Sequence, residues 1–259
     1  MELSLELVLR GTLVFLRVAS ALAVMPVFGY RGLALPVKVG LSAFIAMLLL
    51  PMISMAGGAD LSGMGLLTFI GLAVPEIIAG LVLGMTTHFI FYGVEMAGQL
   101  VGLQMGFGIV AVLDPMTETQ VDIISQLQYL FAILIFLSLN GHHFLLEGLA
   151  RSYLAAPLGG VTLPAGLFGI VVKLSGDIFV AAFKIAAPVM AALLLTEVAL
   201  GIIARTVPQM NIFIVSFPLK IGVGLLALAL SWPLLSYILQ LLWKGFQGDW
   251  EKIIALLGR

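Results

Sequence analysis

The sequence predicts an all-α, membrane-associated protein built from hydrophobic helical hairpins. Of its 259 residues, 62% are hydrophobic and 10% are charged, whereas soluble domains carry roughly 25% charged residues. Several uncharged runs approach the ~20 residues that a helix needs to cross a bilayer. Glycines also recur at four-residue spacing, which is typical of closely packed apolar helices. The absence of cysteine excludes disulfides and thiolate metal sites.

The first hydrophobic run extends from Gly11 to Tyr30, and we expect it to remain part of the protein. Ala21-Leu22-Ala23 has the composition of a signal-peptide cleavage site. However, Glu2 and Glu6 stand where a secretory signal carries basic residues, and Arg17 interrupts the apolar core.

Each of the next two hydrophobic runs contains a proline. The residues between Lys38 and Asp60 are all uncharged, and Pro51 is expected to kink or end their helix, because proline lacks the N–H that a helix interior requires. A third run from Leu66 to Tyr92 is interrupted by Pro75-Glu76. We therefore expect shortened or broken helices in both places.

The central stretch, Glu95 to Asp122, is the part of the chain most suggestive of function. Its glycines lie on one helical face and would allow another helix to approach closely: Gly98, Gly102 and Gly106. Gly80 and Gly84 predict a similar face in the preceding run. The helix should end at Gly106-Phe107-Gly108, and Asp114-Pro115 favours a loop. An apolar loop between membrane segments must be buried in protein or line a cavity, since lipid cannot satisfy its backbone polar groups.

The second half of the chain reads as a further run, a joint and one long hairpin with a tail. Helix-breaking residues around Asn140 close the run, and the joint is rich in glycine and proline. In order, these segments are Ile123 to Leu139, the joint Arg151 to Pro164, the hairpin arms Leu167 to Arg205 and Phe213 to Leu242, and the polar tail Lys244 to Arg259.

Charged side chains occur at depths where lipid does not tolerate them. A charge at the centre of a spanning helix costs roughly 2.5–3.5 kcal/mol on insertion scales, so these residues should be paired or hydrated. Residues 39–150 contain seven acidic and no basic residues, so the acidic ones have no lysine or arginine partner within that range. The embedded charges are Arg17, Glu76, Glu95, Asp177, Lys184, Glu197, Arg205 and Lys220.

Motifs for enzymatic chemistry are weak. Gly106 to Ala111 formally matches a dinucleotide fingerprint, but it follows an apolar helix instead of a strand. His142, His143 and Glu147 could be written as a metal site, although a wet helix end explains them better. No nucleophile elbow, phosphate loop or basic stripe for nucleic acid is present in the sequence. We expect no catalytic activity, no cofactor, no metal and no nucleic-acid partner.

Two blocks of sequence carry a resemblance to a known family. The first combines Glu95, the spaced glycines, Gly106-Phe107-Gly108 and Asp114-Pro115. The second is Arg205 to Phe213 followed by Ser216-Phe217-Pro218-Leu219-Lys220. Together with the length and hydropathy of the chain, they resemble the FliR family of type III secretion export-gate proteins. Phe217 before the proline favours the flagellar branch over the injectisome branch.

This resemblance implies a core subunit of the flagellar export gate. Such a subunit would lie in the bacterial inner membrane at the flagellar basal body, in contact with lipid, and would pass unfolded flagellar proteins. It would be bound to FliP, FliQ and FlhB homologues. Residues 1–165 are similar to FliP, with the central loop included, and residues 166–259 are similar to the FliQ hairpin with a polar tail added.

The resemblance also implies roles for individual residues. A plug loop would consist of Gly106, Phe107, Gly108, Ile109, Val110, Ala111, Val112, Leu113, Asp114 and Pro115. The face of Gly98, Gly102 and Gly106 would pack on neighbouring subunits. Polar or charged assembly contacts would be made by Arg17, Glu95, Asp177, Lys184, Glu197, Arg205, Gln209 and Asn211.

Two other classes of membrane protein fit parts of the sequence. In a secondary transporter, Asp177, Lys184, Glu197 and Arg205 would bind a small substrate or relay protons. That class predicts paired broken helices, yet only the break near Gly106 is strong. A structural membrane scaffold without a pore is the third possibility that composition leaves open.

Overall fold

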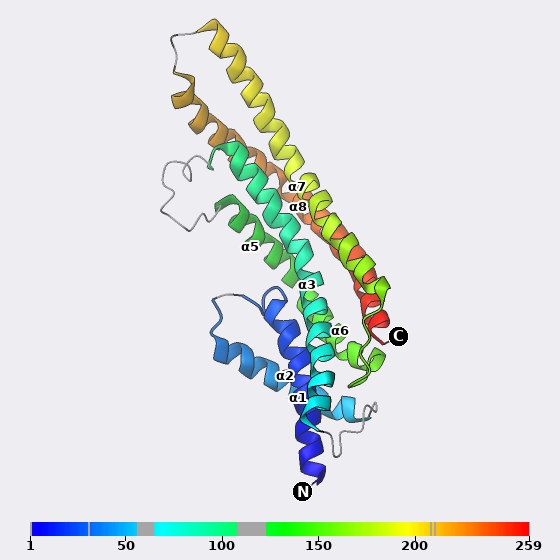
Figure 1. Ribbon diagram of the computed structural model, residues 1–259. Helices are drawn as coiled ribbons and strands as arrows, with labels where there is room; N and C mark the ends of the chain where they lie inside the picture. Colours follow the sequence, from blue (N-terminus) through cyan, green and yellow to red (C-terminus); the bar gives the residue numbers. More distant parts are fainter. Residues whose placement is uncertain are drawn as a thin grey trace. The chain divides into compact units, whose positions relative to one another are not determined.

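Seven helices account for most of the chain in the computed structural model, which describes residues 2–30, 32–55, 65–107, 123–207, 209 and 211–258. Within these ranges the protein is all-α, as the sequence predicts (Figure 1). The helices are α1 (Glu2–Val24), α2 (Leu35–Met55), α3 (Leu66–Met105), α5 (Ile123–Ser138), α6 (Gly141–Ala155), α7 (Ala165–Thr206) and α8 (Ile212–Leu257).

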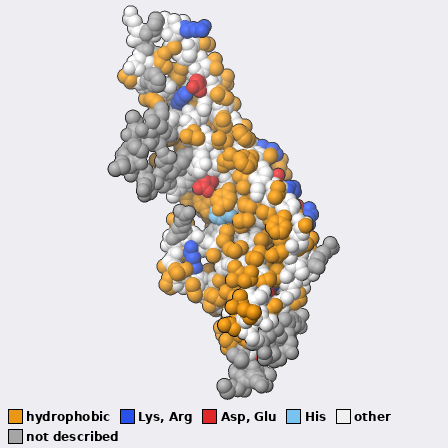
Figure 2. All heavy atoms as spheres, viewed as in Figure 1, with side chains coloured by type: hydrophobic (Ala, Val, Ile, Leu, Met, Phe, Trp, Pro, Cys, Tyr) orange, Lys and Arg blue, Asp and Glu red, His pale blue; other side chains and the backbone are white. Residues whose placement is uncertain are grey.

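Five of the described helices are long and apolar enough to cross a membrane: α1, α2, α3, α7 and α8. A sixth span would result if α5 and α6, which meet at a bend of 66°, are counted together. Figure 2 shows hydrophobic side chains over much of the face in view, with few charged groups among them. Exposed apolar surface of this extent is typical of a protein that lies in lipid or among apolar partners. The prediction of membrane helices is therefore confirmed.

The expected interruptions at proline do not occur. α2 continues through Pro51 to Met55, and α3 runs without a break through Pro75 to Met105. The prediction of an interruption at Pro75 is therefore wrong, and of the two outcomes expected at Pro51, a kink or an end, the end does not occur. Each proline removes one backbone hydrogen bond and bends the helix. Ending the helix in apolar surroundings would leave several backbone groups without partners, which is the worse alternative.

The C-terminal arm is also longer than predicted. α8 extends from Ile212 to Leu257, so the segment from Lys244 onward continues the helix instead of forming a separate tail. Trp250 and Ile253 in this segment are completely buried. Their burial explains why the helix persists, because an amphipathic face that packs on other helices stabilises the turns that carry it.

Other boundaries agree with the local sequence chemistry. α5 ends at Ser138, and Asn140 adopts the left-handed conformation, with φ 56°, before α6 begins. α7 ends at Thr206 and α8 begins at Ile212, close to the predicted inner ends of the hairpin arms at Arg205 and Phe213. The glycine- and proline-rich joint is shorter than expected, since α6 continues to Ala155.

The chain forms two compact units, and the first comprises residues 1–89, 136–175 and 244–259. Its core contains α1, α6, the first half of α3 and the last turns of α8. α1 lies against Gly80 and Gly84, where a methyl group would collide with the backbone of Arg17 and Ala21. This confirms the close-packing face predicted there. The buried indole N–H of Trp250 donates to the carbonyl oxygen of Leu83 at 3.3 Å.

The turn after α1, also in the first unit, contains an unusual backbone conformation. Val27 has φ 71°, and the Phe28 N–H donates to the Pro26 carbonyl oxygen at 2.9 Å. A hydrogen bond between residues two apart around a positive φ defines a γ-turn of the strained kind, and a β-branched residue seldom occupies it. Lys38 Nζ donates to the carbonyl oxygen of Gly29 at 3.0 Å, which closes the turn toward α2.

The second unit comprises residues 90–135 and 176–243. The second half of α3 lies among three other helices of this unit. α5 contacts it where Ser125 Oγ donates to the Glu95 carbonyl oxygen at 2.8 Å. A methyl group on Gly93 would lie 3.0 Å from Cβ of Ala181 on α7. α8 contacts the end of α3, and α3 therefore occupies the centre of this unit.

Candidate functional site

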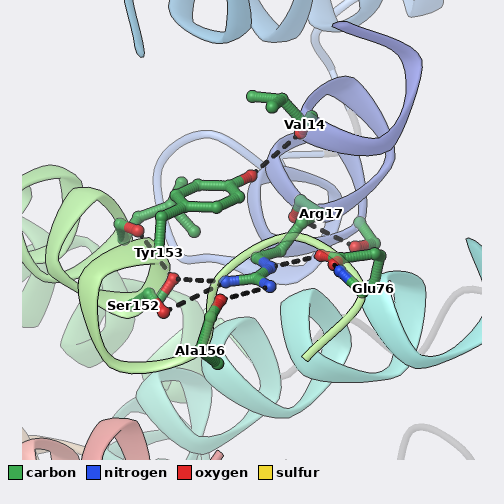
Figure 3. A network of polar contacts seen from close by, with 9 residues as sticks. Val14, Arg17, Glu76, Ser152, Tyr153 and Ala156 are labelled. Atoms are coloured by element: carbon green, nitrogen blue, oxygen red, sulfur yellow. Dashed lines mark hydrogen bonds and ion pairs between the residues drawn. The ribbon is translucent and has the colours of Figure 1, made fainter. Parts of the chain in front are cut away.

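The most completely buried charges form an ion pair inside the first unit. Arg17 on α1 and Glu76 on α3 are joined by Nε and Oε2 at 2.6 Å, and both side chains are 0% exposed (Figure 3). The pair brings together residues that are 59 positions apart. A buried charge without a partner is strongly unfavourable, so each of these residues depends on the other.

Arg17 also holds the end of α6. One terminal nitrogen donates to the backbone oxygen of Ser152 at 3.1 Å and to its hydroxyl at 3.3 Å, and the other donates to the backbone oxygen of Ala156 at 3.0 Å. These acceptors belong to the last turn of α6 and its cap. There the Ala156 carbonyl has no partner within the helix, whereas the Ser152 carbonyl also accepts the Ala156 N–H. A cation at this end also complements the helix dipole.

The remaining contacts satisfy Glu76 and enclose the guanidinium group. Glu76 Oε1 accepts the backbone N–H of Gly159 at 3.1 Å. The ring of Tyr153 lies 4.2 Å from the Arg17 guanidinium carbon, and its hydroxyl donates to the Val14 carbonyl oxygen at 3.0 Å (Figure 3). The cluster joins α1, α3, α6 and the segment that follows α6. Every charge has a partner and both charged side chains are fully buried, so this geometry suits a structural clamp and not a proton relay or a substrate site.

Sequence reasoning identified the charges of this cluster but not their pairing. Arg17 was expected to make an assembly contact, whereas the structure places it against groups of its own chain. Ser152, Tyr153 and Gly159 were not singled out at all. One signal was available: residues 39–150 contain no basic residue, so the buried Glu76 had to find its partner outside that range.

The second site is the point in the other unit where α3 ends. Gly106 has φ 98°, its N–H donates to the Leu103 carbonyl oxygen at 3.1 Å, and the Phe107 N–H donates to the Gly102 carbonyl oxygen at 3.1 Å. These two bonds and the positive φ constitute a Schellman cap. Glycine is favoured at Gly106 because other residues rarely adopt this conformation. The local sequence therefore fixes where the helix ends.

The glycine face of α3 is covered by elements of the same unit. A methyl group on Gly98 would lie 2.8 Å from the backbone nitrogen of Ser125 on α5. One on Gly106 would lie 2.9 Å from the ring of Phe217 on α8. Gly102 is buried between them. Gly98 and Gly106 therefore pack against other helices of the same chain. The sequence led us to expect that they pack against a neighbouring subunit.

The predicted plug loop is described only at its beginning. Gly106 and Phe107 belong to the described residues. The others lie outside them: Gly108, Ile109, Val110, Ala111, Val112, Leu113, Asp114 and Pro115.

The other polar residues predicted as contacts differ in their surroundings. Asp177, Lys184 and Arg205 are exposed on α7 and have no ion-pair partner within the part of the chain that the structure describes. Gln209 and Asn211 are exposed at the hairpin turn, and Glu95 is half-buried. Glu197 accepts a hydrogen bond from Gln104 Nε2 at 3.1 Å and lies 3.3 Å from Lys220 Nζ.

The described residues offer little support for a transporter or a metal site. Asp177, Lys184 and Arg205 are dispersed along an exposed helix and do not converge on a cavity. A small hollow in the first unit is lined by Glu147, Arg151, Trp250 and neighbouring residues. There the Glu147 carboxylate is engaged by Arg151 at 2.6 Å. Among the residues with described positions, no group of three histidine, aspartate or glutamate side chains could hold a metal ion.

Comparison with known proteins identifies one family that matches most of the chain. The family described as "Bacterial export proteins, family 1" matches residues 8–246. The flagellar biosynthetic protein FliR of Bacillus subtilis (strain 168) is 32% identical over 249 residues, which cover 95% of each chain. FliR of Escherichia coli (strain K12) is 32% identical over 221 residues, which cover 85% of this chain and 83% of the relative. The chain therefore belongs to the bacterial export proteins of family 1, as a relative of the flagellar biosynthetic proteins FliR.

Proposed function

We propose that this protein is a non-catalytic core subunit of the flagellar type III export gate in the bacterial inner membrane. It would form part of the pore through which unfolded flagellar proteins are secreted, in one complex with FliP, FliQ and FlhB homologues. The observation that carries this proposal is the family match, which extends over residues 8–246 and thus includes the central loop, the second unit and most of the first unit.

The exposed polar residues supply a reason for assembly. Asp177 and Lys184 lie two turns apart on α7, on nearly the same face, among apolar side chains that are also exposed. Charges in apolar surroundings need opposite charges or water. We infer that partner subunits complete these residues together with Arg205, Gln209 and Asn211, and that residues 1–165 and 166–259 take the places of a FliP-like and a FliQ-like element.

Coexpression tests the assembly proposal. We expect the chain to purify as a protease-resistant complex when FliP and FliQ homologues are present, and to be degraded when it is expressed alone. An Asp177→Asn, Lys184→Met double variant should lower the yield of complex several-fold. The matched control is Arg151→Met, which removes an exposed charge that already pairs within the chain. A stable, monodisperse chain made alone would contradict the proposal.

The segment from Gly106 to Pro115 is proposed to be the plug of the pore. Its apolar residues follow a capped helix end, and burying them in the closed gate would stabilise that state at ~25 cal/mol per Å² of apolar surface. A loop of this size corresponds to a few kcal/mol, which is enough to bias a gate without unfolding a large complex.

Deleting Ile109 to Val112 tests this role. We expect the complex to purify normally while cells that produce it become permeable to small ions and dyes. Deleting Ala56 to Ala59, an equally long piece of another connection between apolar segments, serves as the control and should leave the membrane sealed. An intact complex that stays sealed after the first deletion would rule out the plug.

A further inference from the structure

The last turn of α3 in the second unit packs against one face of α8. Phe217, Lys220 and Gly224 are spaced by three and four residues, so they lie on the same side of that helix. Opposite them stand Met105 and Gly106, the residues at which α3 ends. We call Phe217, Lys220 and Gly224 the root contact, because they hold the residues from which the central loop starts.

The root contact consists mainly of close packing. A methyl group on Gly224 would lie 2.7 Å from Cγ of Met105, so a larger residue there requires the methionine side chain, which is 0% exposed, to move. The ring of Phe217 occupies the space beside Gly106, at 2.9 Å from a methyl group placed there. Moving either side chain requires its neighbours to move as well, because protein interiors are closely packed.

Polar contacts connect the same point to α7. Glu197 accepts a hydrogen bond from Gln104 on α3 at 3.1 Å and lies 3.3 Å from Lys220 Nζ on α8. The Glu197 side chain is 55% exposed, and exposed ion pairs contribute little to stability. These contacts connect the three helices at this point, and the closer approach is that of Met105 to Gly224.

We propose that the root contact is a positioning element which keeps the start of the central loop fixed whether the gate is open or closed. This inference rests on the proposed plug function of the loop. It assigns roles to Gly224 and Phe217 as positioning residues that act through Met105 and Gly106. Lys220 acts through Glu197, which holds Gln104 in the last turn of α3. It also explains why the two sequence blocks that are far apart in the chain belong together: one supplies the end of α3 and the other supplies the face that holds it.

A disulfide tests the geometry directly, since the chain contains no cysteine of its own. In a Met105→Cys, Gly224→Cys variant the sulfur at position 105 can take the place of Met105 Cγ, which lies 2.7 Å from a Cβ at position 224. This proximity is of the kind that a disulfide requires. The control is Met105→Cys, Gly222→Cys. Gly222 lies two positions earlier on α8, and a methyl group there would meet no other atom within 4 Å.

Both variants are examined in the assembled complex in membranes, with an oxidant and with a reductant. We expect an intramolecular cross-link in the first pair at a yield at least tenfold above that of the control. Secretion by the oxidised complex should remain within twofold of that by the same complex after reduction. Absence of the cross-link would overturn the geometry. Several-fold loss of secretion on oxidation, with recovery on reduction, would overturn the fixed position.

A second comparison tests positioning through permeability. Gly224→Leu should displace Met105 and raise dye leakage several-fold, whereas Gly222→Leu on the open side of α8 should not. Adding Met105→Ala to Gly224→Leu returns the required space and should lower leakage again, or restore assembly if the single variant does not assemble. A Gly224→Leu complex that stays sealed while the Ile109 to Val112 deletion leaks would overturn the root contact, as would a double variant that is no better than Gly224→Leu. If the deletion itself stays sealed, the plug proposal fails and the cross-link still decides the geometry.

Discussion

Removing either member of the buried pair between Arg17 and Glu76 should destabilise the first unit severely. Arg17→Met leaves the Glu76 carboxylate buried with the Gly159 N–H as its remaining donor. Glu76→Leu leaves a buried guanidinium group with neutral acceptors only. Breaking a buried ion pair on one side typically costs about 3–5 kcal/mol, so we expect a loss of this size from each single variant.

The double variant separates the free energy of the ion pair from that of the other hydrogen bonds that Arg17 and Glu76 make. Arg17→Met with Glu76→Leu leaves no buried charge, but the Ala156 carbonyl and the Gly159 N–H lose their partners, at about 1–3 kcal/mol each. The Ser152 carbonyl is less affected, because it still accepts the Ala156 N–H at 2.9 Å. The double variant should therefore be less destabilised than the sum of the singles, by a coupling energy near the upper end of the roughly 0.5–3 kcal/mol measured for contacting residues.

Pulse proteolysis of the solubilised complex in increasing urea measures these differences, because cleavage reports the population of the unfolded chain. Arg10→Met is the matched control. Arg10 pairs with Glu6 on the same helix at 2.8 Å, but both side chains are partly exposed, so its loss should cost less than about 1 kcal/mol. Equal losses for Arg17→Met and Arg10→Met, or strictly additive single variants, would refute the assignment of the cluster as a structural clamp.

Two smaller substitutions probe backbone and packing. Gly148→Ala places a methyl group where the ring of Trp250 lies, so it should destabilise the first unit by about 1–3 kcal/mol. The control is Gly245→Ala, which has open space around it and should be neutral or slightly stabilising. Similar urea midpoints for the two variants would contradict the packing of Gly148 against Trp250. Val27→Gly should remove a backbone strain of about 1–3 kcal/mol at a positive φ. Glycine also makes the unfolded chain more flexible, which lowers the free energy of unfolding by roughly 0.5–1 kcal/mol. The net effect should be stabilising. A higher urea midpoint is the expected result, and a lower one would show that Val27 is not strained.

The class of the fold and several places where helices begin and end follow from the amino-acid sequence alone. Gly106 needs a positive φ and caps α3, and Asn140 adopts the left-handed conformation between α5 and α6. Both effects are local, because the conformational preferences of one residue and its neighbours decide them. Hydrophobic composition likewise sufficed to predict helices that can span a membrane, since lipid leaves the backbone few alternatives.

Which charges meet and how far helices continue depends on how the helices pack in three dimensions. Arg17 and Glu76 carry opposite charges, but their separation of 59 residues gives no local signal that they pair. Pro51 was expected to kink or end its helix and Pro75 to interrupt its own, whereas both helices continue, because apolar surroundings make continued helix the better state. The partners of Gly98 and Gly106 were equally invisible in the sequence. A bare helical face predicts that something packs there, and only the three-dimensional arrangement identifies Ser125 and Phe217 as the residues that do.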